Sequence, residues 1–145
     1  MICLLQKVIH GQVTVNQRTI GKIDKGLVVL IGFQPGDNSV KLDKMAQKML
    51  NYRVFSDENE KMNLNVQQVD GDLLLVPQFT LAADTRSGLR PSFSSSAKPE
   101  IARKLFQEFL TLVETKYRQP QNGEFGANMQ VSLTNDGPVT FWLEV

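Results

Sequence analysis

Apolar and polar residues alternate over several short stretches of the chain, and this two-residue period is typical of β-strands. Four such stretches open the sequence: Ile2–Ile9, Gln12–Val15, Arg18–Ile23 and Leu27–Gly32. Asp24-Lys25-Gly26 has the composition of a tight hairpin turn and is expected to join the last two. Because the last stretch is apolar on both faces, it is predicted to lie in the middle of a sheet.

Two later segments carry apolar residues at the 3.6-residue spacing of an amphipathic helix. The first covers about Val40–Tyr52 and follows a turn, Pro35–Ser39, that offers capping side chains. The second has Pro99 in its first turn, where a missing N–H is tolerated, and should end near Tyr117–Pro120. The other segments are predicted to be a short strand at Val54-Phe55, a loop over Ser56–Gln68, a buried strand over Asp72–Gln78, an irregular segment over Ala82–Ser96 and a loop over Gln121–Asn128.

Two further alternating runs, Met129–Leu133 and Val139–Val145, flank the stretch Asn135-Asp136-Gly137-Pro138. All four residue types of this stretch favour turns, so spacing alone indicates an ordinary turn between two strands. A Gly-Pro step in a fixed conformation could instead hold two carbonyl groups in one direction. We predict an α+β fold in a single domain, residues 1–145: a mainly antiparallel sheet curled towards a barrel, with two packed helices.

Composition and charge narrow the possible functions. The chain has 145 residues, enough for one domain with a sizeable core. Its net charge of +1 gives no global field for nucleic acid, so any such contact must use a local patch. Cys3 is the only cysteine, which excludes an internal disulfide. The apolar start at Met1–Leu5 is too short for a signal peptide or a membrane span, and a cytoplasmic protein is expected.

The usual catalytic and metal-binding sets are absent from the sequence. His10 is the only histidine, so a serine or cysteine nucleophile would have no other imidazole base. One Cys and one His cannot form an ordinary zinc site. We interpret His10 as a surface or turn residue, Cys3 as a small core residue and the acidic run Asp57–Glu60 as a solvated loop. No cofactor and no metal are expected.

The segment Pro77-Gln78-Phe79-Thr80-Leu81 ends a predicted buried strand. Backbone N–H groups just past such an end can point into a pocket as an oxyanion hole. Thr80 adds a hydroxyl, although no base is visible to activate it. The alternative is a simple strand exit in which Phe79 and Leu81 belong to the core.

Several motifs together resemble those of the bacterial D-aminoacyl-tRNA deacylases, also called D-tyrosyl-tRNA deacylases. That family carries S-Q-F-T-L and N-x-G-P-V-T, and this chain has P-Q-F-T-L at Pro77–Leu81 and N-D-G-P-V-T at Asn135–Thr140. Pro77 replaces the family's serine and removes a hydroxyl and an N–H. The neighbouring N–H groups of Gln78, Phe79 and Thr80 are kept, so we expect activity to remain. Further matching stretches follow in the same order: Asn51–Asp57, Lys61–Asn65, Gly88–Phe93 and Phe125–Leu133.

The resemblance implies hydrolysis of the ester that joins a D-amino acid to the 3′ end of tRNA, which proofreads chirality. Such an ester is labile, so positioning can contribute about 7–11 kcal/mol and each oxyanion donor roughly 3 kcal/mol without a strong nucleophile. The catalytic residues implied are Gln78, Phe79 and Thr80, acting chiefly through their backbone N–H groups. The 2′-OH of the terminal adenosine is expected to assist.

In this family the Gly-Pro bond is cis and enters the active site of the other subunit of a homodimer. Mapped here, the carbonyls of Gly137 and Pro138 would receive the substrate ammonium and occupy the space that an L side chain needs. A glycyl ester has no side chain, so glycine mischarged on tRNA-Ala should also be accepted. Met129, Leu81 and Ala82 are assigned to the substrate site, with a core role as the alternative for Met129.

Five basic residues are candidates for a tRNA-binding patch, since phosphate contacts need only local charge: Arg86, Arg90, Lys98, Arg103 and Lys104. The alternative for each is a solvated loop or helix face. Two other functions remain open, a non-catalytic nucleic-acid-binding module of the same fold, because eukaryotic relatives have been linked to DNA, and an esterase that acts on small molecules. The low net charge and the few aromatic residues disfavour the nucleic-acid module.

Overall fold

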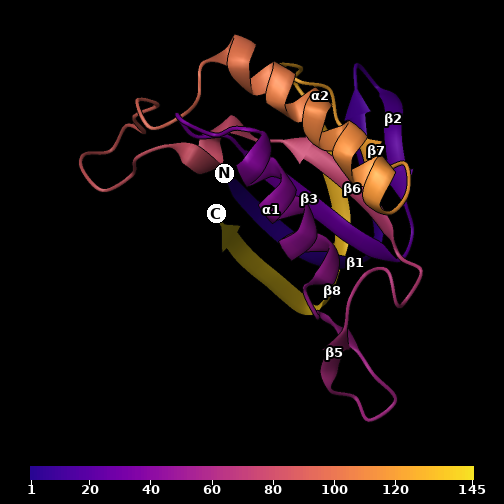
Figure 1. Ribbon diagram of the computed structural model, residues 1–145. Helices are drawn as coiled ribbons and strands as arrows, with labels where there is room; N and C mark the ends of the chain where they lie inside the picture. Colours follow the sequence, from indigo (N-terminus) through magenta and orange to yellow (C-terminus); the bar gives the residue numbers. More distant parts are fainter.

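One long strand, β1 (Ile2–Val15), pairs along its whole length in the computed structural model, which describes residues 1–145. On one edge of β1 lie first β3 (Gly26–Gly32) and then β2 (Arg18–Ile23), both antiparallel to it. On the other edge lies β8 (Gln130–Glu144), also antiparallel. β1 is therefore the central strand from which the sheet extends (Figure 1).

The sheet continues from β3 through β6 (Asp72–Pro77) to the short strand β7 (Gln121–Asn122), and both of these pairings are parallel. β7 in turn approaches β2, where the Lys22 N–H donates to the Gln121 side-chain oxygen at 3.4 Å. The sheet thus curls into a nearly closed barrel. The predicted α+β class is confirmed, with parallel pairs that the sequence pattern did not reveal.

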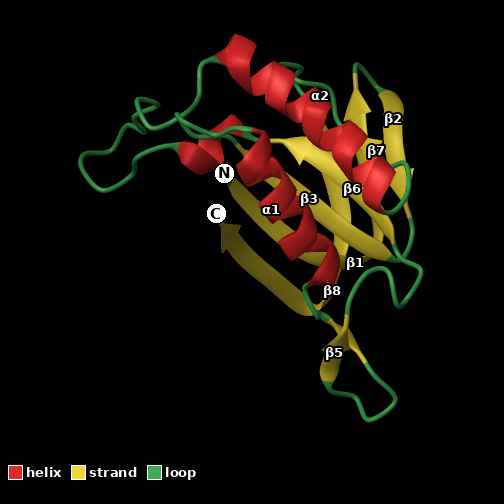
Figure 2. Ribbon diagram, viewed as in Figure 1, coloured by secondary structure: helices red, strands yellow, loops and turns green.

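Two helices, α1 (Ser39–Asn51) and α2 (Pro99–Lys116), lie together over one face of the sheet (Figure 2). Asn38 caps α1 by accepting the Lys41 N–H at 3.1 Å, and Pro99 occupies the first turn of α2, as predicted.

A short 3-10 turn, η1 (Phe79–Ala82), follows β6. A small hairpin of β4 (Phe55–Ser56) and β5 (Met62–Leu64) projects from the body. Neither helix has the length and apolar character needed to cross a bilayer.

Both faces of the central strands are buried, which confirms the position predicted for the strand over 27–32. Leu27, Val29 and Ile31 belong to a cluster of 23 buried residues that also includes the inner faces of both helices. Val28 belongs to a second cluster of 6 residues on the other face of the sheet, together with Leu74. Alternate side chains of one strand therefore contribute to two separate cores.

Two expectations about the first strands are wrong. Ile2–Ile9 and Gln12–Val15 form one strand, because β8 pairs with β1 on both sides of His10. Asp24-Lys25-Gly26 does not close a hairpin, because β2 and β3 both pair with β1 and not with each other. The place beside β3 is taken by β6, which runs so close that a Cβ on Gly26 would lie 1.9 Å from the Asp72 carbonyl oxygen.

The two C-terminal runs, Met129–Leu133 and Val139–Val145, are not joined by a hairpin turn either. They belong to the single strand β8, and both halves pair with β1. The register jumps between them, since Val8 pairs with Asn135 whereas Gln6 pairs with Thr140. Residues 136–139 therefore leave the ladder opposite Lys7, and we call them the 136–139 bulge.

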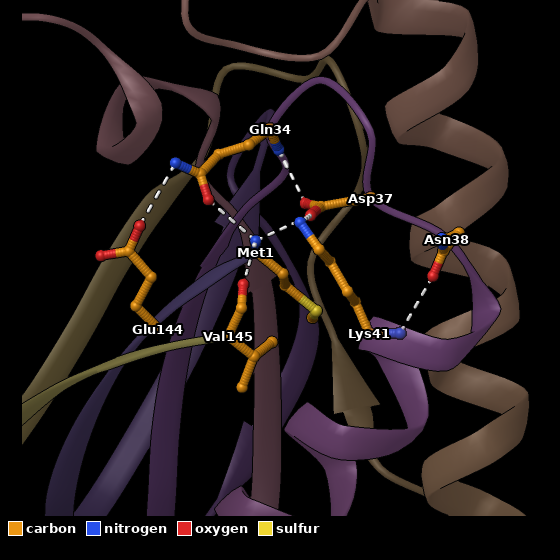
Figure 3. Close-up of polar contacts among 7 residues, drawn as sticks. All are labelled: Met1, Gln34, Asp37, Asn38, Lys41, Glu144 and Val145. Carbon is orange, nitrogen blue, oxygen red and sulfur yellow. Dashed lines mark hydrogen bonds and ion pairs between the residues drawn. The ribbon is translucent and has the colours of Figure 1, made fainter.

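The amino group of Met1 is buried in a polar cluster that ties both ends of the chain to α1 (Figure 3). It donates to Asp37 Oδ1 and Gln34 Oε1, each at 2.8 Å, and to the Val145 carbonyl at 3.2 Å. The Met1 and Asp37 side chains have 0% exposure. Asp37 also accepts the Gln34 N–H at 2.8 Å, so its carboxylate shapes the turn that leads into α1.

Asp37→Asn should lower the free energy of unfolding by about 3–5 kcal/mol, because it leaves the Met1 ammonium buried without its counter-charge. The change would be measured by urea unfolding at one fixed protein concentration. Lys41→Met is the control, because the Lys41 ammonium lies 3.4 Å from the same carboxylate but its side chain is 39% exposed, and it should cost less than about 1 kcal/mol. Equal losses in the two variants would contradict the prediction.

Candidate active site

The segment Pro77–Leu81 leaves the sheet at the end of β6 and turns directly into η1. The Gln78 N–H donates to the Ile31 carbonyl at 2.7 Å and so continues the ladder between β3 and β6. This backbone donor is occupied within the chain, which leaves the N–H groups of Phe79 and Thr80 as the candidate oxyanion donors. The Gln78 side chain instead donates to the Thr80 hydroxyl oxygen.

The N–H groups of Phe79 and Thr80 are the first two of η1, so they have no acceptor inside the turn. Both side chains are exposed, and the turn stands at the surface just past a buried strand end. The only histidine, His10, lies near Asp24, with 4.0 Å between Nδ1 and the carboxylate. His10 lies on β1 seven residues beyond Cys3, which is level with Ile31 and with the end of β6 that leads into η1. No imidazole is therefore near Thr80.

An apolar pocket of about 210 Å³ opens beside the first residue of η1. Its walls come from the end of β6, the start of α2 and the loop before β8, and its lining residues are Pro77, Phe79, Ala97, Pro99, Ala102, Phe125 and Gly126. The exposed N–H donors and the apolar pocket therefore share Phe79. This arrangement can hold an aromatic or other planar group next to a reacting carbonyl.

Two serines fasten the loop after η1 onto the turn itself. Ser95 Oγ donates to the Ala82 carbonyl at 2.6 Å, and Ser96 Oγ donates to the Phe79 carbonyl at 3.3 Å. The rings of Phe79 and Phe93 lie 5.1 Å apart between centroids. Neither serine could be recognised in the sequence, where Ser94-Ser95-Ser96 has only the composition of a loop.

The other predicted substrate residues do not line the apolar pocket. Leu81 and Ala82 line a second hollow of about 430 Å³, which also borders Trp142 and Glu144. Met129 is half-buried against the second core, and its sulfur accepts the Glu124 N–H at 3.3 Å. A Cβ on Gly123 would touch both the Met129 sulfur and Pro77, so Met129 lies close behind the end of β6.

Gly137 and Pro138 occupy the tip of the 136–139 bulge, and the bond between them is cis. Gly137 has a φ of +149°, and a Cβ there would lie 2.6 Å from Val139 Cγ2, so only glycine fits. The bulge lies three strands from β6, roughly 14 Å across the sheet, and about four residues, or 13 Å, along it. Within one chain, the structure does not bring Gly137 and Pro138 to Phe79 and Thr80.

The five basic residues separate into two groups. Lys98, directly before α2, and Arg103 and Lys104, on its first half, are all exposed. The Arg103 guanidinium lies 5.1 Å from the ring centroid of Phe125 in the pocket wall. Arg86 makes a two-point contact with Asp84, at 2.9 and 2.7 Å, on the exposed loop that also carries Arg90. This contact lowers the pKa of Asp84 and raises that of Arg86, so both stay charged and the Asp84 carboxylate partly offsets the positive charge of Arg86.

Titratable groups contribute little to this region. Cys3 is buried in the larger core, where desolvation raises the pKa of its thiol far above the usual value. The interpretation of Cys3 as a core residue is confirmed. No group of three or more His, Cys, Asp or Glu side chains is placed to hold a metal ion.

The fold and site define a class that comparison with known proteins identifies. The model of the family described as D-Tyr-tRNA(Tyr) deacylase matches residues 4–144. A D-aminoacyl-tRNA deacylase of Hydrogenovibrio crunogenus is 66% identical over 148 residues, which cover 99% of each chain. One from Histophilus somni is 59% identical over 145 residues and covers both chains completely.

Solved structures agree. The c-Myc DNA Unwinding Element Binding Protein superposes with a TM-score of 0.96 and 37% identity, over 100% of this chain and 99% of that one. A probable eukaryotic D-amino acid tRNA deacylase superposes with a TM-score of 0.84 at 19% identity, over 99% and 98%, and that likeness shows the fold alone. The chain belongs to the D-Tyr-tRNA(Tyr) deacylase family, as its motifs predicted.

Proposed function

We propose that this protein hydrolyses the ester between a D-amino acid and the 3′ end of tRNA at η1, with the N–H groups of Phe79 and Thr80 as oxyanion donors. The activity itself, that of a D-aminoacyl-tRNA deacylase, a hydrolase of ester bonds, is the activity for which its close relatives are named. The observation that carries the site is the pair of N–H groups at the start of an exposed turn, directly beside an apolar pocket.

The proposed mechanism uses positioning and backbone donors. An aminoacyl ester needs no strong nucleophile, and an aimed donor contributes about 3 kcal/mol to its transition state. Gln78 acts through its side chain, which holds the Thr80 hydroxyl and with it the start of the turn. Pro77 has no N–H, but no hydrogen bond to β3 is lost at this point, because the Gln78 N–H makes the bond to the Ile31 carbonyl. The terminal adenosine supplies its own 2′-OH.

The apolar pocket suits a flat nucleic-acid base, because Phe79 and Phe125 offer aromatic surface on which a base can stack. Lys98, Arg103 and Lys104 lie on the same side, at the start of α2, and would contact the phosphates that follow. Arg90 and the Asp84-paired Arg86 extend this patch more weakly. A substrate held in this way is an aminoacyl-tRNA, and a cytoplasmic location would suit it.

The chiral filter needs a second copy of the chain. Gly137 and Pro138 are too far from η1 within one chain, while β8 is an edge strand with exposed apolar side chains at Val131 and Trp142. A homodimer formed over this edge would carry each 136–139 bulge into the partner's site. There the bulge would exclude an L side chain and accept a D-amino acid or glycine. In this proposal residues 1–145 form one deacylase domain.

One comparison favours a second candidate, a nucleic-acid-binding role without catalysis. The c-Myc DNA Unwinding Element Binding Protein is 37% identical to this chain over its full length. A DNA-binding module would need neither the two turn donors nor the bulge. Hydrolysis of an aminoacyl ester distinguishes the two candidates directly.

Purified protein incubated with D-tyrosyl-tRNA and L-tyrosyl-tRNA in parallel should remove only the D ester at a high rate. The measurement is loss of labelled amino acid from tRNA with time. Equal loss of both esters would leave an esterase without the chiral filter, and binding without hydrolysis would favour the nucleic-acid-binding candidate. Hydrolysis of a small D-tyrosyl ester at the same rate would indicate a small-molecule esterase.

Thr80→Ala should keep activity within about tenfold of the wild type, because the alanine retains the backbone N–H and the hydroxyl has no base beside it. The measurement is kcat/KM for D-tyrosyl-tRNA. A loss of more than about a thousandfold, roughly 4 kcal/mol, would make the Thr80 hydroxyl a nucleophile and overturn the backbone mechanism.

Binding of tRNA should weaken by about tenfold or more between 50 and 200 mM salt if three cationic side chains contact phosphates. Lys104→Ala should make this salt dependence shallower. Lys61→Ala is the control, because Lys61 lies on the projecting β4–β5 hairpin, away from α2. A flat response to salt would eliminate the patch.

A further inference from the structure

We propose that Asn135 is a specificity-determining positioning residue, whose side-chain amide holds the 136–139 bulge in the shape with which Gly137 and Pro138 reject L-aminoacyl esters. The inference rests on the chiral filter proposed above. It concerns a different question, namely what keeps the filter in place within its own chain.

The amide of Asn135 spans the base of the bulge. β8 leaves its ladder with β1 after Asn135 and rejoins it at Thr140. Asn135 Oδ1 accepts the Val139 N–H at 2.7 Å. Asn135 Nδ2 donates to the Val139 carbonyl at 3.3 Å and to Thr140 Oγ1 at 2.9 Å. One side chain therefore joins the residue before the bulge to the two residues that end it.

These contacts replace the hydrogen bonds that β1 cannot provide. Residues 136–139 have no partner on β1, and an open segment of this length would otherwise be fixed only at its ends. Asn135 is half-buried, and its bonds to Val139 are partly shielded from water. The Asn135 side chain bonds to both the N–H and the carbonyl of Val139, as the backbone of a neighbouring strand would.

The other contact to the bulge is weaker. The Lys7 ammonium lies 3.7 Å from the Asp136 carboxylate, and Asp136 is 54% exposed. The Lys7 side chain is only 13% exposed, but an ion pair at this distance with one half-exposed partner holds the bulge less tightly than the three Asn135 hydrogen bonds. Exclusion of an L side chain requires that Gly137 and Pro138 stay in a fixed position. Hydrolysis at Phe79 and Thr80 has no such requirement. Loosening the bulge should therefore affect the L ester more than the D ester.

The test compares Asn135→Ala with Thr134→Ala, using kcat/KM for D-tyrosyl-tRNA and for L-tyrosyl-tRNA. Thr134 is the matched control, because it is the exposed neighbour on the same strand and its side chain makes no hydrogen bond to the bulge. Asn135→Ala should lower the D-to-L ratio by about tenfold or more, chiefly through faster loss of the L ester. Thr134→Ala should keep the wild-type ratio.

A role in stability alone would lower both rates together and leave the D-to-L ratio unchanged, and that result would overturn the inference. If thermal unfolding shows that Asn135→Ala is not folded, Thr140→Val and Thr140→Ser give the answer. The valine removes the acceptor for Nδ2 and should lower the ratio about threefold, whereas the serine keeps the hydroxyl and should restore it. Equal D-to-L ratios in Thr140→Val and Thr140→Ser would also overturn the inference about Asn135.

The wild-type measurement separates this inference from the proposed function. A wild-type protein that removes both esters equally has no chiral filter, so the proposed function and the inference fail together. A wild-type protein that discriminates, alongside an Asn135→Ala variant that discriminates equally well, rejects only the role of Asn135.

Discussion

The pairing of β1 with three other strands is the constraint on which the rest of the structure depends. On one edge the register with β3 runs without interruption from Ile2 to Val8. On the other edge β8 has more residues than β1 can pair, and it must absorb the excess itself. The excess leaves the ladder as the 136–139 bulge, opposite Lys7. The register of β8 against β1 therefore creates the bulge that carries Gly137 and Pro138. The side chain of Asn135 links the two ends of this bulge.

The buried Met1 ammonium connects this sheet to the candidate site. Asp37, Gln34 and the Val145 carbonyl are its partners, so the first strand, the turn before α1 and the end of β8 meet at one point. Gln34 and Glu144, which contact each other there, also line the hollow beside Leu81 and Ala82. The polar cluster around the Met1 ammonium and the hollow beside Leu81 and Ala82 therefore share Gln34.

Local pattern predicted the helices well, because the spacing of Leu42, Met45 and Met49 and the position of Pro99 depend only on near neighbours. Local pattern failed where the strands or residues that contact each other are distant in sequence. The parallel pairing of β3 with β6, the continuity of β8 and the serine contacts to η1 join segments that no local period relates. The site motifs were found through resemblance, and only the structure showed that the Gln78 N–H is occupied by Ile31.

The proposed function divides two tasks between parts of the fold that do not touch within one chain. Hydrolysis is assigned to η1, where two backbone donors lie beside an apolar pocket and no imidazole is near. Chiral rejection is assigned in the same proposal to the 136–139 bulge, about three strands away. Backbone donors serve D and L esters alike, since neither touches the side chain of the amino acid. In the proposed function, selectivity therefore comes from atoms that another copy of the chain brings to η1, and the rigidity of those atoms determines how well an L side chain is excluded.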